Sequence, residues 1–145
     1  MGDFYNSTGG DHWFNNAGWN VGDPCDWQTP WFGIYCQNLT ATASYIFQIN
    51  LPQNNLTGTL PATLGNLTDL SYIYLNLNSL SGTIPTYFCN YTKMTIIILS
   101  NNHFTGQIPD CIGDLNTTLT YLDLSLNGLS GAIPNYLFNL TLLTK

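Results

Sequence analysis

One sixteen-residue pattern occurs four times in this chain at a nearly constant spacing. The copies begin at Ile46, Leu70, Met94 and Leu119 and share the frame apolar-x-x-apolar-x-Leu-x-x-Asn-x-apolar-x-Gly-x-apolar-Pro. The frame asparagines, separated by 24, 24 and 25 residues, are Asn54, Asn78, Asn102 and Asn127. A fifth copy begins at Leu143, where it matches Leu70. Repetition at this period predicts a stack of similar coils.

Each fixed residue of the frame has a physical reason. The alternating apolar residues predict a short strand with one buried face. An asparagine in every coil can bond the backbone of its own and neighbouring coils. Glycine suits a tight turn with positive φ, and proline is expected to open a short helical turn. These residues are Gly58, Gly82, Gly106 and Gly131, and Pro61, Pro85, Pro109 and Pro134. Because one coil cannot bury its apolar side alone, the pattern predicts a solenoid with a parallel sheet along one wall.

The repeated frame resembles the plant-type leucine-rich repeat, over about residues 45–145. Residues 1–44 resemble the N-terminal cap of the same family, although only Met1–Tyr5 of its usual first helix is expected here. The cap signature is Trp13, Trp19, Asp23-Pro24-Cys25, Trp27 and Phe32-Gly33-Ile34-x-Cys36. The resemblance implies a right-handed α/β solenoid with a concave parallel sheet and short 3-10 or irregular turns on the convex face. It also implies a Cys25–Cys36 disulfide and a cap in which Trp13, Trp19, Trp27 and Trp31 cover the first coil. The alternative for these tryptophans is a site on which sugars stack.

The four cysteines allow three pairings, and sequence spacing favours the two local ones. Cys89 and Cys111 follow the frame prolines of adjacent coils, whose strands should lie roughly 5 Å apart. That distance suits a disulfide, so we expect a covalent link between these coils. The alternative is four free thiols in a cytosolic protein.

The chain has 145 residues, a net charge of −6, no Arg, no Glu and two lysines. This balance argues against nucleic acid and anionic membrane as partners, because few cations are present to meet phosphates. No apolar run reaches the length that spans a bilayer, and no leader is visible at the polar start of the chain.

Seven Asn-x-Thr sequons predict glycosylation in an extracellular or cell-surface location. Their asparagines are Asn6, Asn38, Asn55, Asn66, Asn90, Asn116 and Asn139. Asn66, Asn90 and Asn139 each stand five residues after a frame proline, so we expect a column on the outer side. The alternative is that Asn-Leu-Thr simply belongs to the repeat pattern.

Strand residues that alternate with the buried ones form rows across the coils. The first row is Gln48, Tyr72, Ile96 and Tyr121; the second is Asn50, Tyr74, Ile98 and Asp123; a later row is Gln53, Leu77, Asn101 and Leu126. A contiguous apolar and aromatic patch on an exposed wall favours partner binding. We therefore predict a partner-binding site at Tyr72, Tyr74, Ile96, Ile98, Tyr121 and Asp123. The alternative is that the Tyr and Ile rows only stabilise the sheet.

No catalytic arrangement, phosphate loop or metal-ligand cluster is evident, and no cofactor or metal is expected. We interpret His12 and His103 as solvated turn residues. Asp123 is the single carboxylate of the wall and cannot perform paired acid–base chemistry. Asp23 and Asp26 read as turn formers of the cap, with a calcium site as a weak alternative.

Two functions fit the sequence. The first is a non-enzymatic extracellular recognition module, as the resemblance to receptor ectodomains and to inhibitors of cell-wall hydrolases implies, binding a protein, a peptide or a cell-wall glycan. The second is a structural glycoprotein that assembles head to tail into a filament or coat, through an open end expected where no C-terminal cap follows the repeats. Ice binding is a remote third possibility, because the inner wall has no regular Thr ladder.

Overall fold

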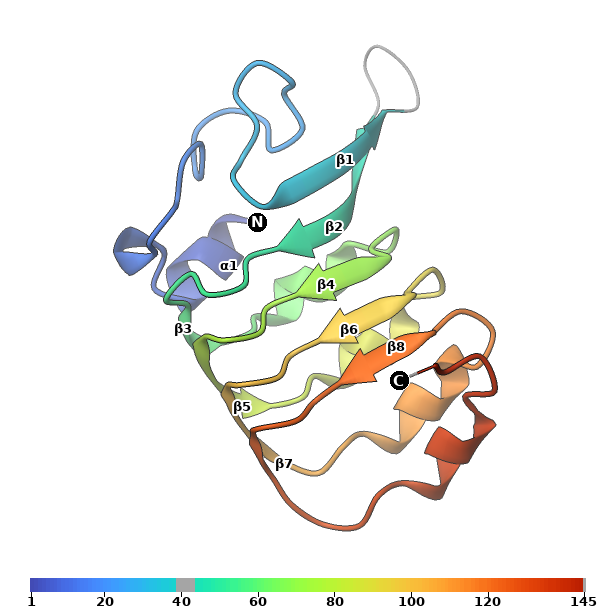
Figure 1. Ribbon diagram of the computed structural model, residues 1–145. Coiled ribbons are helices and arrows are strands. Elements are labelled where there is room, and N and C mark those ends of the chain that lie inside the picture. Colours follow the sequence, from blue (N-terminus) through green and yellow to red (C-terminus); the bar gives the residue numbers. More distant parts are fainter. Residues whose placement is uncertain (39–43, 145) are drawn as a thin grey trace.

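The computed structural model describes residues 1–38 and 44–144, and it shows coils stacked along one axis (Figure 1). A strand of each coil lies in one wall, a second short strand lies at a bend, and a 3-10 turn lies on the opposite side. The predicted solenoid is confirmed.

The first wall is a five-stranded sheet with the order β1-β2-β4-β6-β8. Its strands are β1 (Ile34–Asn38), β2 (Ser44–Asn50), β4 (Tyr72–Tyr74), β6 (Ile96–Ile98) and β8 (Tyr121–Asp123). Strands β2 to β8 are parallel, as predicted, and equivalent repeat positions pair with each other. Strand β1 is antiparallel to β2. This departs from the all-parallel expectation because the two strands follow each other too closely for a parallel crossover.

A second, parallel sheet lies at the bend, with the order β3-β5-β7-β9. Its strands are β3 (Thr57–Thr59), β5 (Ser79–Thr83), β7 (His103–Gly106) and β9 (Gly128–Leu129). Its register is displaced from the repeat, since Thr57 pairs with Ser79 rather than with its repeat equivalent Ser81. Each coil therefore contributes one strand to the first wall and one to this second sheet.

The far side of each coil is a 3-10 helix that begins directly after the frame proline. These helices are η2 (Ala62–Asn66), η3 (Thr86–Asn90), η4 (Asp110–Leu115) and η5 (Asn135–Asn139). The frame prolines stand at the N-cap of each helix. The frame glycines, at the bend, have φ between 71° and 85°, as the tight-turn prediction required.

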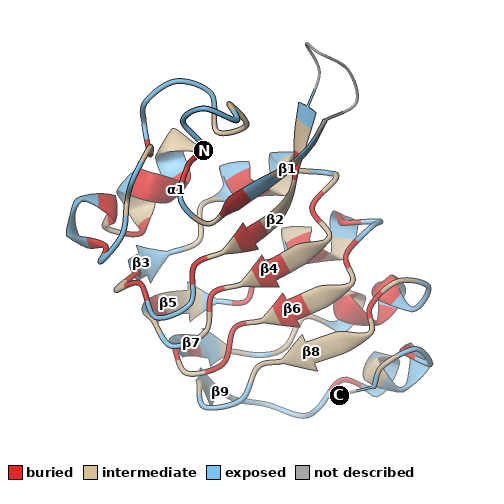
Figure 2. Cartoon of the chain, turned by 45° about the horizontal axis from the view of Figure 1, so that its top comes forward, coloured by how far each residue is buried: buried red, intermediate tan, exposed pale blue. Residues whose placement is uncertain are grey.

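The core runs through the stack between the two sheets and the 3-10 helices. In Figure 2 a buried residue lies between two partly exposed ones in β4 and in β6. Ile49, Ile73 and Ile97, which pair across β2, β4 and β6, are 0–1% exposed. Their alternating neighbours face the other side of the sheet, which forms the inner wall.

The frame asparagines form a ladder inside the bend. Asn102 is 5% exposed; its Nδ2 donates to the carbonyls of Leu75 and Leu99, and its Oδ1 accepts the backbone N–H of Leu80 at 2.9 Å. Asn78 and Asn127 make equivalent bonds to their own coil and to the preceding one. For Asn78, Asn102 and Asn127, the prediction that the side chain bonds the backbone of its own and a neighbouring coil is confirmed.

The first rung of this ladder is different because the preceding element is the cap. The Asn54 Nδ2 donates to the carbonyl of Asn15 at 2.9 Å, and its Oδ1 accepts the Asn15 N–H at 2.7 Å. The ladder therefore continues from the repeats into the cap loop.

The cap contains α1 (Gly2–Ser7) and η1 (Gly10–His12), so its first helix extends two residues beyond the expected Tyr5. Trp13, Trp19 and Trp31 are buried, and each indole N–H donates to a backbone carbonyl. The expectation that Trp27 also covers the core is wrong, because Trp27 is 81% exposed. It lies in a loop in which Asp23 and Asp26 bond the backbone two residues onward, and this turn geometry leaves the ring outside the core.

Both predicted disulfides are present. Cys25–Cys36 lies within the cap and Cys89–Cys111 joins η3 to η4, each with a Cα–Cα distance of 5.6 Å. The second bond links adjacent coils on the side opposite the asparagine ladder.

Candidate ligand-binding wall

The sheet register brings the predicted site residues together on the inner wall. Tyr72 pairs with Ile96, which pairs with Tyr121, and the next row joins Tyr74, Ile98 and Asp123 in the same way. All six side chains are partly buried. We call Tyr72, Tyr74, Ile96, Ile98 and Tyr121 the inner-wall patch.

Close packing within the inner-wall patch changes the pKa of one of its tyrosines. Burial raises the pKa of the Tyr74 hydroxyl, and the neighbouring Tyr72 adds to this effect. The Tyr72 ring also meets the edge of Phe47 with 6.2 Å between ring centroids. Phe47 was absent from the rows of alternating strand residues that the sequence predicted. The strand β2 is distorted where it pairs with β1, so the burial of its residues does not simply alternate.

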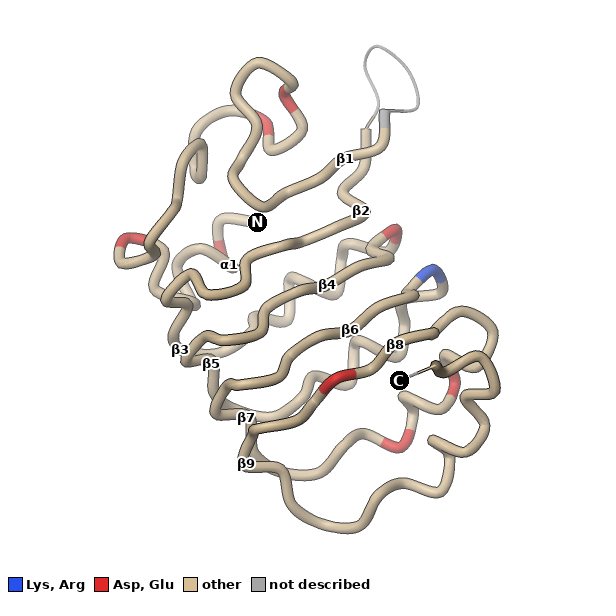
Figure 3. Tube along the Cα trace, in the orientation of Figure 1, with Lys and Arg blue, Asp and Glu red and all other residues tan. Residues whose placement is uncertain are grey.

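The inner wall is almost free of charge. Asp123 is the one charged residue in the described strands of this sheet, and Figure 3 shows it on β8 among uncharged neighbours. Its Oδ1 accepts the N–H of Ser125 at 3.1 Å and the Ser125 hydroxyl at 2.7 Å. A single oriented carboxylate can attract a cation but offers no acid–base pair.

Beside the patch, one residue of every coil has a left-handed backbone. The φ values are 50° at Gln53, 59° at Leu77, 55° at Asn101 and 54° at Leu126. Asparagine tolerates this conformation, whereas leucine is strained in it by roughly 1 kcal/mol. Leu77 and Leu126 are also 43% and 71% exposed. Two strained leucines therefore stand outside the core.

These leucines flank an open groove of about 660 Å³ at the bend. Its lining also includes Asn101, His103 and Thr105 together with the ladder asparagines. We call it the bend groove.

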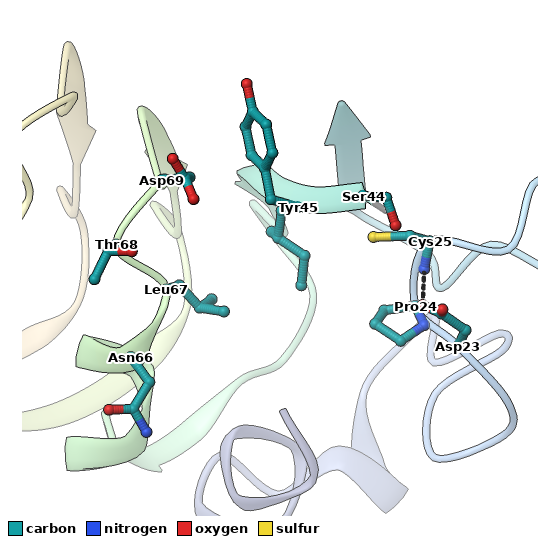
Figure 4. A pocket seen from close by; sticks show the side chains of 10 residues that line it. Asp23, Pro24, Cys25, Ser44, Tyr45, Asn66, Leu67, Thr68 and Asp69 are labelled. Atoms are coloured by element: carbon teal, nitrogen blue, oxygen red, sulfur yellow. Dashed lines mark hydrogen bonds between the residues drawn. The ribbon is translucent and has the colours of Figure 1, made fainter. Parts of the chain in front are cut away.

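A second cavity, of about 320 Å³, lies at the seam between cap and repeats. Figure 4 shows Asp23 and Cys25 on one side of it, Asn66, Thr68 and Asp69 on the other, and Tyr45 between them. Lys93 bonds Asp69 at 2.5 Å near this seam and lies 5.3 Å from the Tyr45 ring centroid. The lining joins three separate segments and shows no convergent set of ligand groups.

The sequon asparagines differ in accessibility. Asn66, Asn90 and Asn139 are the last residues of η2, η3 and η5, so the predicted column exists, and Asn116 directly follows η4. These four and Asn6 are exposed. Asn55 is partly buried, and its Nδ2 donates to the His12 carbonyl at 2.8 Å. Asn38 ends β1, but the rest of its sequon lies outside the described residues.

Neither histidine stands in a catalytic arrangement in the part of the chain that the structure describes. His12 ends η1 and His103 begins β7, and both are exposed. Within residues 1–38 and 44–144, no three His, Cys, Asp or Glu side chains gather as metal ligands. No helix among these residues is both long and apolar enough to cross a bilayer.

The profile of the Leucine Rich Repeat family matches residues 69–91, 93–115 and 118–140. Among solved structures, the leucine-rich-repeat ectodomain of the receptor kinase SOBIR1 from Arabidopsis thaliana has a TM-score of 0.78 at 28% identity, covering 97% of this chain and 71% of that one. No curated protein gives a significant match.

Two further similar structures are complexes. The BIR3–SERK2 complex from Arabidopsis thaliana matches with a TM-score of 0.70 and 34% identity, over 77% of this chain and 58% of that one. The plant peptide hormone receptor RGFR1 in complex with RGF2 matches with a TM-score of 0.68 and 30% identity, over 82% and 20%. The present chain thus spans only part of these two relatives.

Proposed function

Because this chain is a leucine-rich-repeat protein that resembles the ectodomains of plant receptors, we propose that it is an extracellular, non-enzymatic recognition module. Its inner wall binds a protein or peptide. The similar structures include one complex between two proteins and one between a hormone receptor and its peptide. Two disulfides are consistent with an oxidising location.

The inner-wall patch is the observation that carries this proposal. Tyrosine and isoleucine side chains from three adjacent strands form one uncharged surface, and only its edge carries a carboxylate. Rigid aromatic side chains with a polar hydroxyl contribute most to binding when they cluster at the centre of an interface. A sheet that only needed internal stability could have small polar residues on its solvent face.

The test is a selection of phage-displayed random 12-residue peptides on the immobilised protein. We expect selected peptides to lose at least tenfold in affinity for the variant with Tyr72→Ala and Tyr74→Ala, because their main contact area is removed. The control is Tyr136→Ala, which removes a 55%-exposed tyrosine from η5 on the far side. Peptides that bind the double variant and the wild type equally would refute an inner-wall site.

We further propose that the five exposed sequon asparagines, Asn6, Asn66, Asn90, Asn116 and Asn139, carry N-linked glycans, whereas Asn55 does not. The Asn55 amide already bonds the cap backbone, so a transferase would have to break that contact. Glycans on the 3-10 side would keep a chain with few charges soluble and leave the inner wall open. Enzymatic deglycosylation in ¹⁸O-labelled water followed by peptide mass spectrometry reads each site; label at Asn55 with none at Asn66 and Asn90 would reverse this assignment.

A further inference from the structure

Resting on the proposed function, we infer that the bend groove is the specificity pocket of the inner wall. It takes an aliphatic side chain from an extended, cationic peptide segment of the partner, held between Leu77 and Leu126 above Asn101. The juxtaposition that carries this inference is a pair of exposed leucines in left-handed backbone that border the bend groove, each three residues beyond the end of a wall strand, β4 or β8.

The fold does not require leucine at these two positions. The backbone path imposes a left-handed residue before every ladder asparagine, as Gln53 and Asn101 show with φ values of 50° and 55°. Asparagine or glycine would satisfy that path without strain. Neither leucine belongs to the buried core. Strained residues that the fold does not require are a recognised sign of a ligand contact.

The ladder asparagines that line the bend groove are not available to bind a partner. The amide groups of Asn102 and Asn127 are used in bonds to the backbone of adjacent coils. What remains for a partner is the apolar surface of Leu77 and Leu126, with polar groups beside it. Such a setting favours an aliphatic side chain over a charged one.

The negative charge of the molecule favours a bound segment that carries Lys or Arg. The chain carries −6, and Lys93 is already paired with Asp69 at the edge of the stack. Asp123 lies on the inner wall, three residues before Leu126. A segment with Lys or Arg near the aliphatic residue would meet this carboxylate and the overall negative field.

The spacing of the coils favours an extended segment that crosses them. Leu77 and Leu126 belong to coils two steps apart, which corresponds to roughly 10 Å at the usual strand spacing. An extended chain covers that distance with about three residues. One side chain can therefore sit between the leucines, and the inner-wall patch ends at Tyr74, three residues before Leu77.

The experiment uses the same library of random 12-residue peptides, and the best selected peptide is then synthesised with a fluorescent label. We expect enrichment of Lys or Arg next to Leu, Ile or Val. Fluorescence anisotropy should show affinity at least tenfold weaker for Leu77→Gly, and several-fold weaker for Asp123→Ala with a reduced dependence on salt. The matched control Gln53→Gly, with the same backbone in the first coil, should bind normally.

Stability separates a lost contact from a damaged fold. Glycine adopts the left-handed backbone freely, so the Leu77→Gly protein should melt no lower than the wild type while its binding falls. Three results overturn the inference. If a peptide depends on Tyr72 and Tyr74 but binds Leu77→Gly normally, the patch stands and the groove has no role. If enriched peptides lack cations, the partner chemistry is wrong. If wild-type protein selects no peptide, or none that depends on Tyr72 and Tyr74, the proposed function itself fails.

Discussion

Two neighbouring rows of this solenoid use their residues in opposite ways. The ladder row has asparagine in all four coils, with Asn54 and Asn102 almost completely buried. The row immediately before it has the same left-handed backbone in every coil, but its side chains are different, namely Gln53, Leu77, Asn101 and Leu126. Side chains that bond two coils are uniform, whereas side chains that face outward vary.

The difference separates what the fold requires from what is left for binding. In the ladder row the side chain completes the backbone hydrogen bonding, so its chemistry is fixed by its neighbours. In the row before it, the backbone needs only a left-handed φ, and the side chain can be chosen for contact with a partner. The inner-wall patch follows the same rule, since Ile73 and Ile97 are buried while Tyr72, Tyr74, Ile96 and Ile98 vary in type.

The strongest way to break this comparison is to replace one residue of each row within the same coil. Asn102→Ala should destabilise the protein by about 4 kcal/mol, because it leaves the buried Leu80 N–H without its partner and removes one of the two asparagine donors from each of the Leu75 and Leu99 carbonyls. Asn101→Gly, one position earlier, should leave stability nearly unchanged. Guanidinium unfolding at equilibrium measures both, and equal losses in the two variants would show that the rows do not differ.

The covalent link on the far side gives a second, smaller effect. Replacing Cys89 and Cys111 by serine opens a connection between residues 22 apart and should remove about 3 kcal/mol, if chain entropy dominates. The ladder should keep the coils paired, so the β-sheet signal in far-UV circular dichroism should persist below the lowered melting temperature. A double-serine protein with native stability would mean that the ladder alone sets the stacking.

The smallest effect tests the strain at Leu77. Leu77→Gly should be more stable than Leu77→Ala by about 1 kcal/mol, because both remove the side chain but only glycine relieves the left-handed backbone. At Asn78, in the ladder, glycine and alanine should both destabilise strongly. Urea unfolding of the four variants provides the measurement, and an Ala variant at residue 77 as stable as the Gly variant would argue against strain there.

The periodic features of this fold could be predicted from the sequence. Asn78 and Asn102 recur in register, so their bonds to adjacent coils followed from the repeat, as did the pairing of Tyr72 with Ile96. The link between Cys89 and Cys111 followed from their places in neighbouring coils. Repetition fixes which residues are equivalent, and stacking then fixes which are neighbours.

Features that depend on the path between equivalent positions could not be predicted. The register of the second sheet, with Thr57 opposite Ser79, reflects how the coil tilts at the bend, which no residue type encodes. The left-handed backbone at Leu77 was missed for the same reason, since leucine normally signals regular structure. Trp27 was misplaced because its loop belongs to no repeat, and its residue type alone favoured burial.

The most direct test of the account is hydrogen exchange at the amides that the ladder holds. The N–H groups of Leu80 and Phe104 donate to the side chains of Asn102 and Asn127 rather than to another backbone group. If the ladder is the structural axis of the stack, NMR should show these amides exchanging as slowly as the most protected wall-strand amides, through global unfolding. Exchange at the rate of an exposed turn would contradict the central role of the asparagines and the separation of rows that depends on it.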